Sequence, residues 1–321
     1  MEFKDVEAAR EEYKNKLEGI KKARNKTLSI VYGIVFGIEA IILLFNLKSV
    51  TRYMDPFGIF FIFAVVLAES ILIFAVVFLF TNKNTSKEAT NYKKAFKAYF
   101  IEKQQAAVFQ NLEYSHDQGL DKTILESTGL INTGDIYRSN DFTKGKYKDV
   151  NFAQADVHIL NEYKEKDQNG NIHKRTVTIF KGRYIIFEFP KKFEFKMVIS
   201  FNGYERPYIN PKTKRSLSRV ETESPEFNKR FLVYAEDGFE VFYILNPVFI
   251  ESLEKLGQKY NNAISFFFSD NKLYIGINNG NDSFEPPDPY FPINEQKEKN
   301  KVIEEIKSIT EIVDNLKLNQ K

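Results

Sequence analysis

Cysteine and tryptophan are both absent from this chain of 321 residues. Without cysteine the chain forms no disulfide and offers no thiolate to a metal, which excludes disulfide-stabilised and cysteine-ligated zinc proteins. The chain also lacks an excess of one charge, because 46 basic residues stand against 43 acidic ones and give a net charge of +3. This balance does not favour a nucleic-acid-binding protein, and we expect no nucleic-acid partner.

The motifs of the common catalytic classes are missing as well. The sequence has no GxxxxGK[ST] phosphate loop, no strand-linked GxGxxG and no GxSxG elbow. His116, His158 and His173 are scattered without metal-ligand spacing, although a hairpin could bring the last two face to face. The turn at Asn140 and Asp141 offers a single acid, not a pair that could divide acid and base roles. We therefore expect no enzyme activity, no cofactor and no metal site.

Apolar residues are concentrated between residues 28 and 80. Residues 28–47 form one run of 20 and residues 57–80 a second run of 24, joined by the short link "KSVTRYMDP". As helices these runs are roughly 30 Å and 36 Å long, enough to cross the hydrocarbon core of a bilayer. The pattern predicts a transmembrane hairpin over residues 28–80, with the lipid bilayer as a partner.

Basic residues near the span ends predict the orientation of this hairpin. Those on the outer flanks of the two spans are Lys21, Lys22, Arg24, Lys26, Lys83, Lys87, Lys93, Lys94 and Lys97. The link offers only Lys48 and Arg52. We therefore expect a multi-pass protein of the cytoplasmic (inner) membrane, with both termini in the cytoplasm.

Two acids interrupt the apolar runs, Glu39 near the centre of the first and Glu69 near the centre of the second. A charge at the bilayer midplane costs about 2.5–3.5 kcal/mol on insertion scales. The favoured interpretation is that protonated acids hydrogen-bond between helices, within or between chains. The alternatives are a proton- or ion-handling site and snorkelling side chains.

Small residues precede both acids at a spacing of four. They are Gly33 and Gly37 in the first run and Ala64 and Ala68 in the second. This spacing permits close helix contact, so we expect packing there to bring the acids together. The helices are also expected to mediate self-association or contact with a protein partner.

Helical patterns flank the hairpin on both sides. Residues 1–27 are predicted to form a cytoplasmic helical arm and residues 81–114 a helical stalk, since no Gly or Pro occurs between Ile59 and Gln118. Residues 293–321 are predicted to form a C-terminal amphipathic helix. Its heptad seam consists of Val302, Ile306, Ile309, Val313 and Leu316. This seam, about two heptads long, either packs on the domain or the stalk or self-associates as a coiled coil.

Residues 115–292 are predicted to form a cytoplasmic α+β domain, a mainly antiparallel sheet of seven or eight strands with an internal helix. Hairpin turns are expected at Asn169-Gly170, Lys181-Gly182 and Asp237-Gly238, and another hairpin within "AISFFFSDNKLYIGIN". Helices are expected to begin at Ser224-Pro225 and Asn246-Pro247, because Ser and Asn cap helices and Pro fits the first position. The segment "FEPPDPYFP" is expected to be a linker.

Several segments carry a family resemblance: "ESPEFNKRFLVYAEDGFEVFYILNPVFIESL" (223–253), "IYRSNDFTKG" (136–145), "FAQADV" (152–157) and "IFKGRYIIFEF" (179–189). In this order they resemble a bacterial membrane family known as domain of unknown function 3137, over most of residues 90–290. The resemblance implies two membrane spans before a soluble part, and it implies no established activity.

A basic stretch marks one loop of the expected domain. It contains Arg206, Lys212, Lys214, Arg215 and Arg219. Such a loop is either solvated or in contact with anionic lipid. Together these patterns favour a membrane-anchored cytoplasmic binding or scaffold module without catalytic activity. The alternatives are an anionic-lipid-sensing domain and a transport or proton-coupled subunit that uses Glu39 and Glu69.

Overall fold

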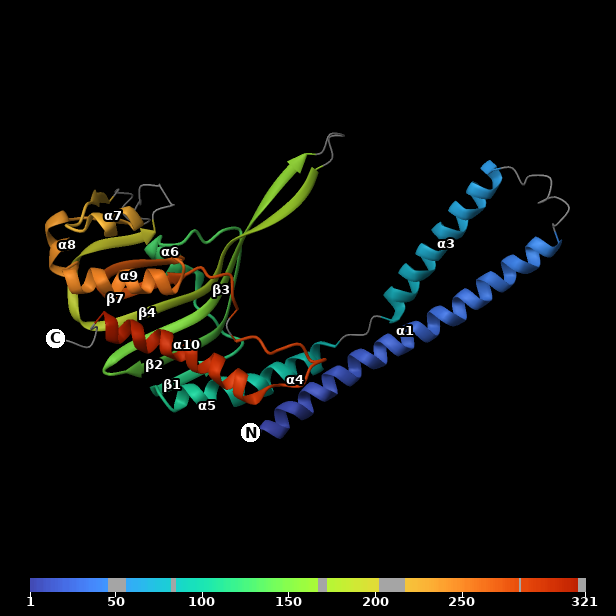
Figure 1. Cartoon of the computed structure of the whole chain (residues 1–321), viewed down its shortest axis with the longest axis horizontal. Coiled ribbons are helices and arrows are strands. Elements are labelled where there is room, and N and C mark those ends of the chain that lie inside the picture. The colour runs from blue at the N-terminus through green and yellow to red at the C-terminus, as the bar shows by residue number, and fades with distance from the viewer. Residues whose placement is uncertain (46–55, 82–84, 167–171, 202–216, 283, 317–321) are drawn as a thin grey trace. The chain divides into compact units, whose positions relative to one another are not determined.

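The computed structural model describes residues 1–45, 56–81, 85–166, 172–201, 217–282 and 284–316 (Figure 1). The chain divides into two compact units, Met1–Ala95 with Pro287–Ile293 and Phe96–Pro286 with Asn294–Lys321. Helices and one large antiparallel sheet confirm the predicted α+β class.

The first unit is a helical hairpin. Its helices are α1 (Phe3–Phe45), α3 (Pro56–Thr81) and the start of α4 (Ser86–Phe96). The hydroxyl of Tyr32 on α1 donates to the carbonyl of Ser70 on α3 at 3.0 Å, and the Arg24 guanidinium lies 5.7 Å from the ring centre of Phe78. Since Arg24 precedes Tyr32 whereas Phe78 follows Ser70, the two helices run antiparallel.

Among the residues that the structure describes, no helix combines the length and the apolar character needed to cross a membrane. The predicted spans are only partly described. Residues 46–55, which hold the end of the first span and most of the link, lie outside the described residues.

The proline-rich segment Pro287–Ile293, expected to be a linker, is an ordered part of the first unit. The hydroxyl of Tyr92 on α4 donates to its first carbonyl at 3.0 Å. Arg10 of α1 donates to the carbonyl of Pro289 at 2.6 Å. Backbone carbonyls of this segment thus satisfy donors from two helices, which a solvated linker would leave to water.

The second unit is built on a sheet with helices on its faces. Its strands are β1 (Gln110–Ser115), β2 (Ile136–Tyr147), β3 (Val150–Lys166), β4 (Ile172–Phe201), β5 (Ser218–Val220), β6 (Phe231–Ala235) and β7 (Ile264–Ile277). Its helices are the π-helical turn η2 (Lys97–Glu102), α5 (Lys103–Ala106), α6 (Lys122–Thr128), α7 (Pro225–Arg230), α8 (Gly238–Ile244), α9 (Pro247–Lys259) and α10 (Glu295–Asn315). The strand order is β1-β2-β3-β4-β6-β5, and β7 also pairs with β4.

Two predicted hairpins are wrong, because the long central strand β4 and its neighbour β7 both run through the expected turns. The chain passes Lys181 and Gly182 without turning. Glycine is required at position 182 because the backbone of β7 approaches closely there, and not because the chain turns. Its φ is +153°, and a Cβ at this position would lie 2.0 Å from the carbonyl oxygen of Ile277. Strand β7 likewise runs unbroken through the predicted turn, with Asp270 at a φ of +56° where its register with β4 shifts.

The predicted hairpin at Asp237-Gly238 is also wrong. Here β6 ends and α8 begins, because the Asp237 side chain accepts a hydrogen bond from the backbone N–H of Phe239 at 2.8 Å and caps the helix. The predicted start of α9 is confirmed. Asn246 accepts from the N–H of Phe249 at 3.0 Å, and Pro247 occupies the first turn.

The start of α7 is confirmed in the same way, since Ser224 accepts from the N–H of Phe227 at 3.2 Å. The predicted stalk over residues 81–114 is wrong at its C-terminal end. Helix α5 ends at Ala106, and Gln110–Ser115 is the edge strand β1, paired with β2. Residues 82–84 lie outside the described residues.

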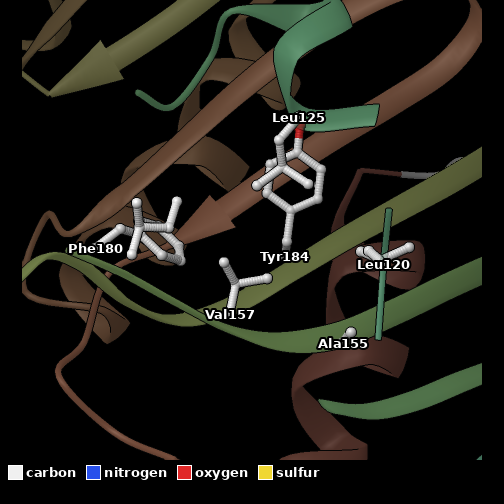
Figure 2. Packing of buried hydrophobic residues seen from close by; sticks show 7 residues of the cluster. Leu120, Leu125, Ala155, Val157, Phe180 and Tyr184 are labelled. Atoms are coloured by element: carbon white, nitrogen blue, oxygen red, sulfur yellow. The ribbon is translucent and has the colours of Figure 1, made fainter. Parts of the chain in front are cut away.

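Strand alternation gives the centre of the sheet two different faces. On one face, Val157 of β3 and Tyr184 of β4 pack with Leu125 of α6 in an apolar cluster (Figure 2). The hydroxyl of Tyr184 lies 3.0 Å from that of Thr128, so its polar end is satisfied. The intervening positions put charged side chains on the opposite face.

Helix α10 lies along that opposite face (Figure 1). All five residues of its predicted heptad seam are buried, and the helix contacts η2, α5 and α9 of its own unit. The seam therefore packs on the domain and does not form a coiled coil in this chain.

Candidate functional site

The two acids of the predicted spans are neighbours in the first unit. Glu39 of α1 and Glu69 of α3 share a side-chain hydrogen bond. The contact joins α1 to α3, as does the bond between Tyr32 and Ser70.

The small residues do not form the contact between these helices. A Cβ added at Gly33 or at Gly37 would meet nothing within 4 Å, and Ala64 and Ala68 are exposed. The acids are thus brought together by other positions of the hairpin. Packing of the small residues between copies of the chain stays a prediction.

The predicted lipid-binding stretch is only partly described. Arg206, Lys212, Lys214 and Arg215 lie outside the described residues. Arg219 is exposed on β5, 3.9 Å from the carboxylate of Glu221. Its contact with lipid stays a prediction.

The histidines do not meet. In the register of β3 and β4, His158 lies opposite Lys181 and His173 lies opposite Glu165, so the suggested pairing across the hairpin is wrong. The ring of His158 lies instead 3.1 Å from the hydroxyl of Thr178. The reason is the register of the hairpin, in which Lys166 faces Ile172, so that His158 lies farther from the turn than His173 does.

An ionic cluster, defined here as Lys97, Asp141, Asp156, Arg183 and Asp282, occupies the α10 face of the sheet, and all of its members are buried except Asp282, which is half-buried. The sequence places Lys97 among the basic residues that flank the second span. Lys97 is instead the first residue of η2, only 3% exposed, with its Nζ atom 2.6 Å and 2.8 Å from the two carboxylate oxygens of Asp141. Such π-helical turns occur frequently at functional positions.

The backbone of Asp141 is itself unusual. Its φ is +57°, at the place where the register between β2 and β3 shifts. Its carboxylate also accepts hydrogen bonds from the Tyr114 hydroxyl at 2.6 Å and from the Asn140 amide at 2.7 Å. The bulge thus turns one carboxylate into the interior, where four donor contacts converge on it.

Arg183 of β4 provides the second cation of the cluster. Its Nε lies 3.3 Å from Asp156, its Nη1 donates to Glu305 of α10 at 2.9 Å, and its guanidinium lies 4.7 Å from the Phe284 ring centre. The third carboxylate is that of Asp282. Carboxylate oxygens of Asp141, Asp156 and Asp282 all lie within 4.8 Å of one another.

Burial controls the protonation of these groups. It raises the pKa of the Asp141 carboxyl above its usual value, although the Lys97 ammonium acts in the opposite direction. It also raises the pKa of the Tyr114 hydroxyl, which therefore remains a donor. Burial alone would lower the pKa of Arg183, but Asp156 and Glu305 outweigh it and raise that pKa.

Three carboxylates at this distance resemble a divalent-cation site, but the cluster supplies its own cations. The Lys97 ammonium contacts both oxygens of Asp141, and Arg183 contacts Asp156, so a metal would have to displace them. Sequence reasoning found only one acid here because the members come from five separate segments. The residues that neighbour Asp141 in the sequence do not predict its left-handed backbone conformation.

An open hollow of about 390 Å³ crosses β1, β2, β3, β4 and β7. Its lining includes Lys144 with Glu113, 3.4 Å apart, and Lys272 with Glu188, 3.8 Å apart. These mixed charges offer hydrogen-bonding groups of both kinds, although most of the exposed lining is apolar, with Phe152, Ala153 and Ile186 among its residues.

One family model matches part of this chain. The model of a family described as "Protein of unknown function (DUF3137)" matches residues 178–318 and confirms the resemblance to that family over this part of the chain. The quoted segments at 136–145 and 152–157 lie outside the match. No curated protein matches the chain. One similar solved structure is that of the mycobacterial trehalose monomycolate transport factor A, TtfA. It has 6% identity and a TM-score of 0.36, over 70% of this chain and 94% of that chain. The family description assigns no activity.

Proposed function

For a chain whose residues 178–318 match a family of unknown function, we propose a role as a membrane-anchored binding or scaffold module without catalytic activity. In this proposal α1 and α3 insert into the inner membrane. The sheet-containing unit stays in the cytoplasm and offers its surface to a partner.

The observation that carries the proposal is the gathering of exposed apolar side chains on the hairpin. They are Ile30, Ile34, Phe36, Ile38, Ile41, Val65, Leu67, Ile71, Leu72, Phe74, Val76, Phe78 and Leu79. Soluble monomers rarely expose a continuous apolar surface of this kind, which marks contact with a membrane or a partner. The apolar runs of residues 28–47 and 57–80, each long enough to cross a bilayer and each interrupted by one acid, favour lipid over a protein partner.

The orientation rests on the flanking basic residues of the two runs. Lys97 leaves that count because it is buried with Asp141. Lys21, Lys22, Arg24, Lys26, Lys83, Lys87, Lys93 and Lys94 remain, against two basic residues in the link. The excess still favours a cytoplasmic location for both termini.

Alkaline carbonate extraction of membranes that contain the full chain tests the anchor. We expect the protein to remain in the membrane pellet, and its release into the supernatant would refute the anchor. Leu72→Lys should weaken retention, because a charge at depth costs about 3 kcal/mol. Phe239→Lys is the matched control, since Phe239 is 83% exposed on α8 of the other unit, where a charge meets water.

The hydrogen bond between Glu39 and Glu69 fits a role in holding the hairpin together. Glutamine keeps both a donor and an acceptor, so Glu39→Gln with Glu69→Gln should retain the stability of the hairpin. Glu39→Leu should reduce it, because Glu69 then loses its partner. Thermal unfolding of the detergent-solubilised chain measures both.

The rival role, proton transport through the same two acids, is tested in proteoliposomes. A pH-sensitive dye trapped inside should report no proton flux for the wild-type chain. A flux that disappears in the Glu39→Gln, Glu69→Gln variant would favour the rival over the scaffold.

A further inference from the structure

A two-stranded ribbon extends from the sheet of the second unit (Figure 1). We call it the β-arm and define it as residues 161–166 of β3 and 172–177 of β4, paired from Asn161 with Val177 to Lys166 with Ile172. The pairing of β2 with β3 ends at Leu160, and the pairing of β7 with β4 ends at Arg183. Beyond those points the two strands have only each other as strand neighbours among the described residues.

An isolated two-stranded ribbon is at best marginally stable in water. The β-arm is nevertheless regular over six residue pairs, about 20 Å of strand. Apart from the residues at its base its side chains are exposed, including Tyr163 at 48% and Ile172 at 60%. Such an element gains little stability from buried side chains of its own, so we expect its role to lie in a contact with a binding partner.

The two faces of the β-arm differ in charge. Directly opposed residues point to the same face of a ribbon. One face, which we call the basic face, consists of Glu162, Lys164, Lys166, Ile172, Lys174 and Thr176. Lys164 lies directly opposite Lys174, an arrangement of like charges that destabilises a strand pair.

Only one acid balances this face. The carboxylate of Glu162 lies 3.6 Å from the Lys174 ammonium. On the other face, by contrast, Arg175 is paired with Glu165 at 3.4 Å. The strand alternation therefore collects a net positive charge on one side of the β-arm and leaves the other side balanced.

We propose that the basic face of the β-arm binds the anionic headgroup surface of a lipid bilayer. This inference rests on the proposed anchoring, which brings the unit within reach of such a surface. Three lysines on one face can contact several phosphates together, and the exposed Ile172 beside Lys166 adds an apolar contact at the interface. Binding also offsets the repulsion between Lys164 and Lys174.

A fluorescent probe on a single cysteine tests the contact in the full chain, since the natural chain has no cysteine. Thr176→Cys carries an environment-sensitive nitrobenzoxadiazole dye on the basic face. Tyr163→Cys carries it on the opposite face as a control. The labelled chain is placed in nanodiscs of phosphatidylcholine alone or with about one-third phosphatidylserine.

We expect the dye at position 176 to shift to the blue in the anionic nanodiscs only, and the dye at position 163 to remain at its aqueous emission. Each lysine near such a surface strengthens contact roughly fivefold, so Lys164→Gln, Lys166→Gln and Lys174→Gln together should abolish the shift. High salt should weaken it.

The matched control replaces Lys229, Lys255 and Lys307 by Gln, which removes the same charge from exposed sites elsewhere on the unit. This variant should keep the shift. Circular dichroism of both triple variants checks that the sheet is retained.

Equal emission in the two kinds of nanodisc, or a shift that survives loss of the three β-arm lysines, would overturn the inference. So would a shift on addition of duplex DNA or polyglutamate to neutral nanodiscs without any response to phosphatidylserine. A chain that fails to co-elute with nanodiscs refutes the anchor itself. A chain that co-elutes without the shift refutes only the role of the β-arm.

Discussion

Replacing Lys97 by methionine is expected to destabilise the second unit by about 3–5 kcal/mol. Methionine has a similar length to lysine and fills most of its space, so little packing is lost. What remains is the carboxylate of Asp141, 1% exposed, without the ammonium that lies 2.6 Å and 2.8 Å from its oxygens. Water cannot replace the lysine at a site this deeply buried.

The reciprocal change, Asp141→Asn, should also destabilise the unit, because the buried Lys97 ammonium then keeps only the more distant carboxylate of Glu285, 3.9 Å away. Asparagine suits this position, since it tolerates the φ of +57° and can still accept from the Tyr114 hydroxyl. The double variant buries neither charge. We expect the stability loss of the double variant to be smaller than the sum of the two single losses, by at least about 2 kcal/mol.

Acid should partly rescue the Lys97→Met variant. Burial already raises the folded pKa of Asp141 above its unfolded value, and loss of the lysine raises it further. Between the unfolded and folded pKa the folded state binds more protons, so stability falls as pH rises through this window and is recovered as pH decreases.

Urea unfolding of the full chain in detergent, followed by the circular dichroism of the sheet, measures these energies. The control is Lys229→Met, whose partner Glu226 lies 2.7 Å away with both side chains more than two-thirds exposed, and it should cost less than about 1 kcal/mol. A similarly small cost for Lys97→Met, or strict additivity in the double variant, would refute the coupling within the ionic cluster.

Three further predictions concern the second unit. Asn246→Ala should cost about 1 kcal/mol in urea unfolding, because the N–H of Phe249 loses its acceptor; no loss would argue against the cap. Ile309→Ala, at a fully buried seam position of α10, should cost about 2–5 kcal/mol, whereas Ile303→Ala, at a 38% exposed position, should cost less than about 0.5 kcal/mol. Burial lowers the pKa of His158, so the unfolded state binds its proton more tightly and stability falls as pH drops below about 6.5. His158→Gln should flatten that part of the pH profile, and an unchanged profile would contradict the assignment.

Local signals in the sequence predicted the elements that depend on a few neighbouring residues. The caps at Ser224 and Asn246 are formed by side chains that reach only three positions along the chain. The same kind of signal gave a wrong prediction at Asp237-Gly238, because Asp followed by Gly is typical both of a hairpin turn and of the start of a helix. The Asp237 side chain resolved the choice by accepting from the N–H of Phe239.

Longer-range features could not be predicted in this way. The sequence predicted a turn at Gly182. Glycine is needed there because the Ile277 carbonyl, almost a hundred residues away in the sequence, leaves no space for a side chain. Lys97 was interpreted as a membrane-flanking charge because its partner, Asp141, is distant in sequence. Pairing of strands over such separations sets which charges meet, and a single sequence does not encode it in its local pattern.

The topology of the hairpin can be tested most directly with one cysteine on the sheet-containing unit. Lys255→Cys places a thiol on the exposed surface of α9 in a chain that otherwise has none. A membrane-impermeant maleimide added to intact bacterial spheroplasts should leave this thiol unlabelled and should label it fully after permeabilisation. Labelling of the intact cells would contradict a cytoplasmic unit anchored by α1 and α3.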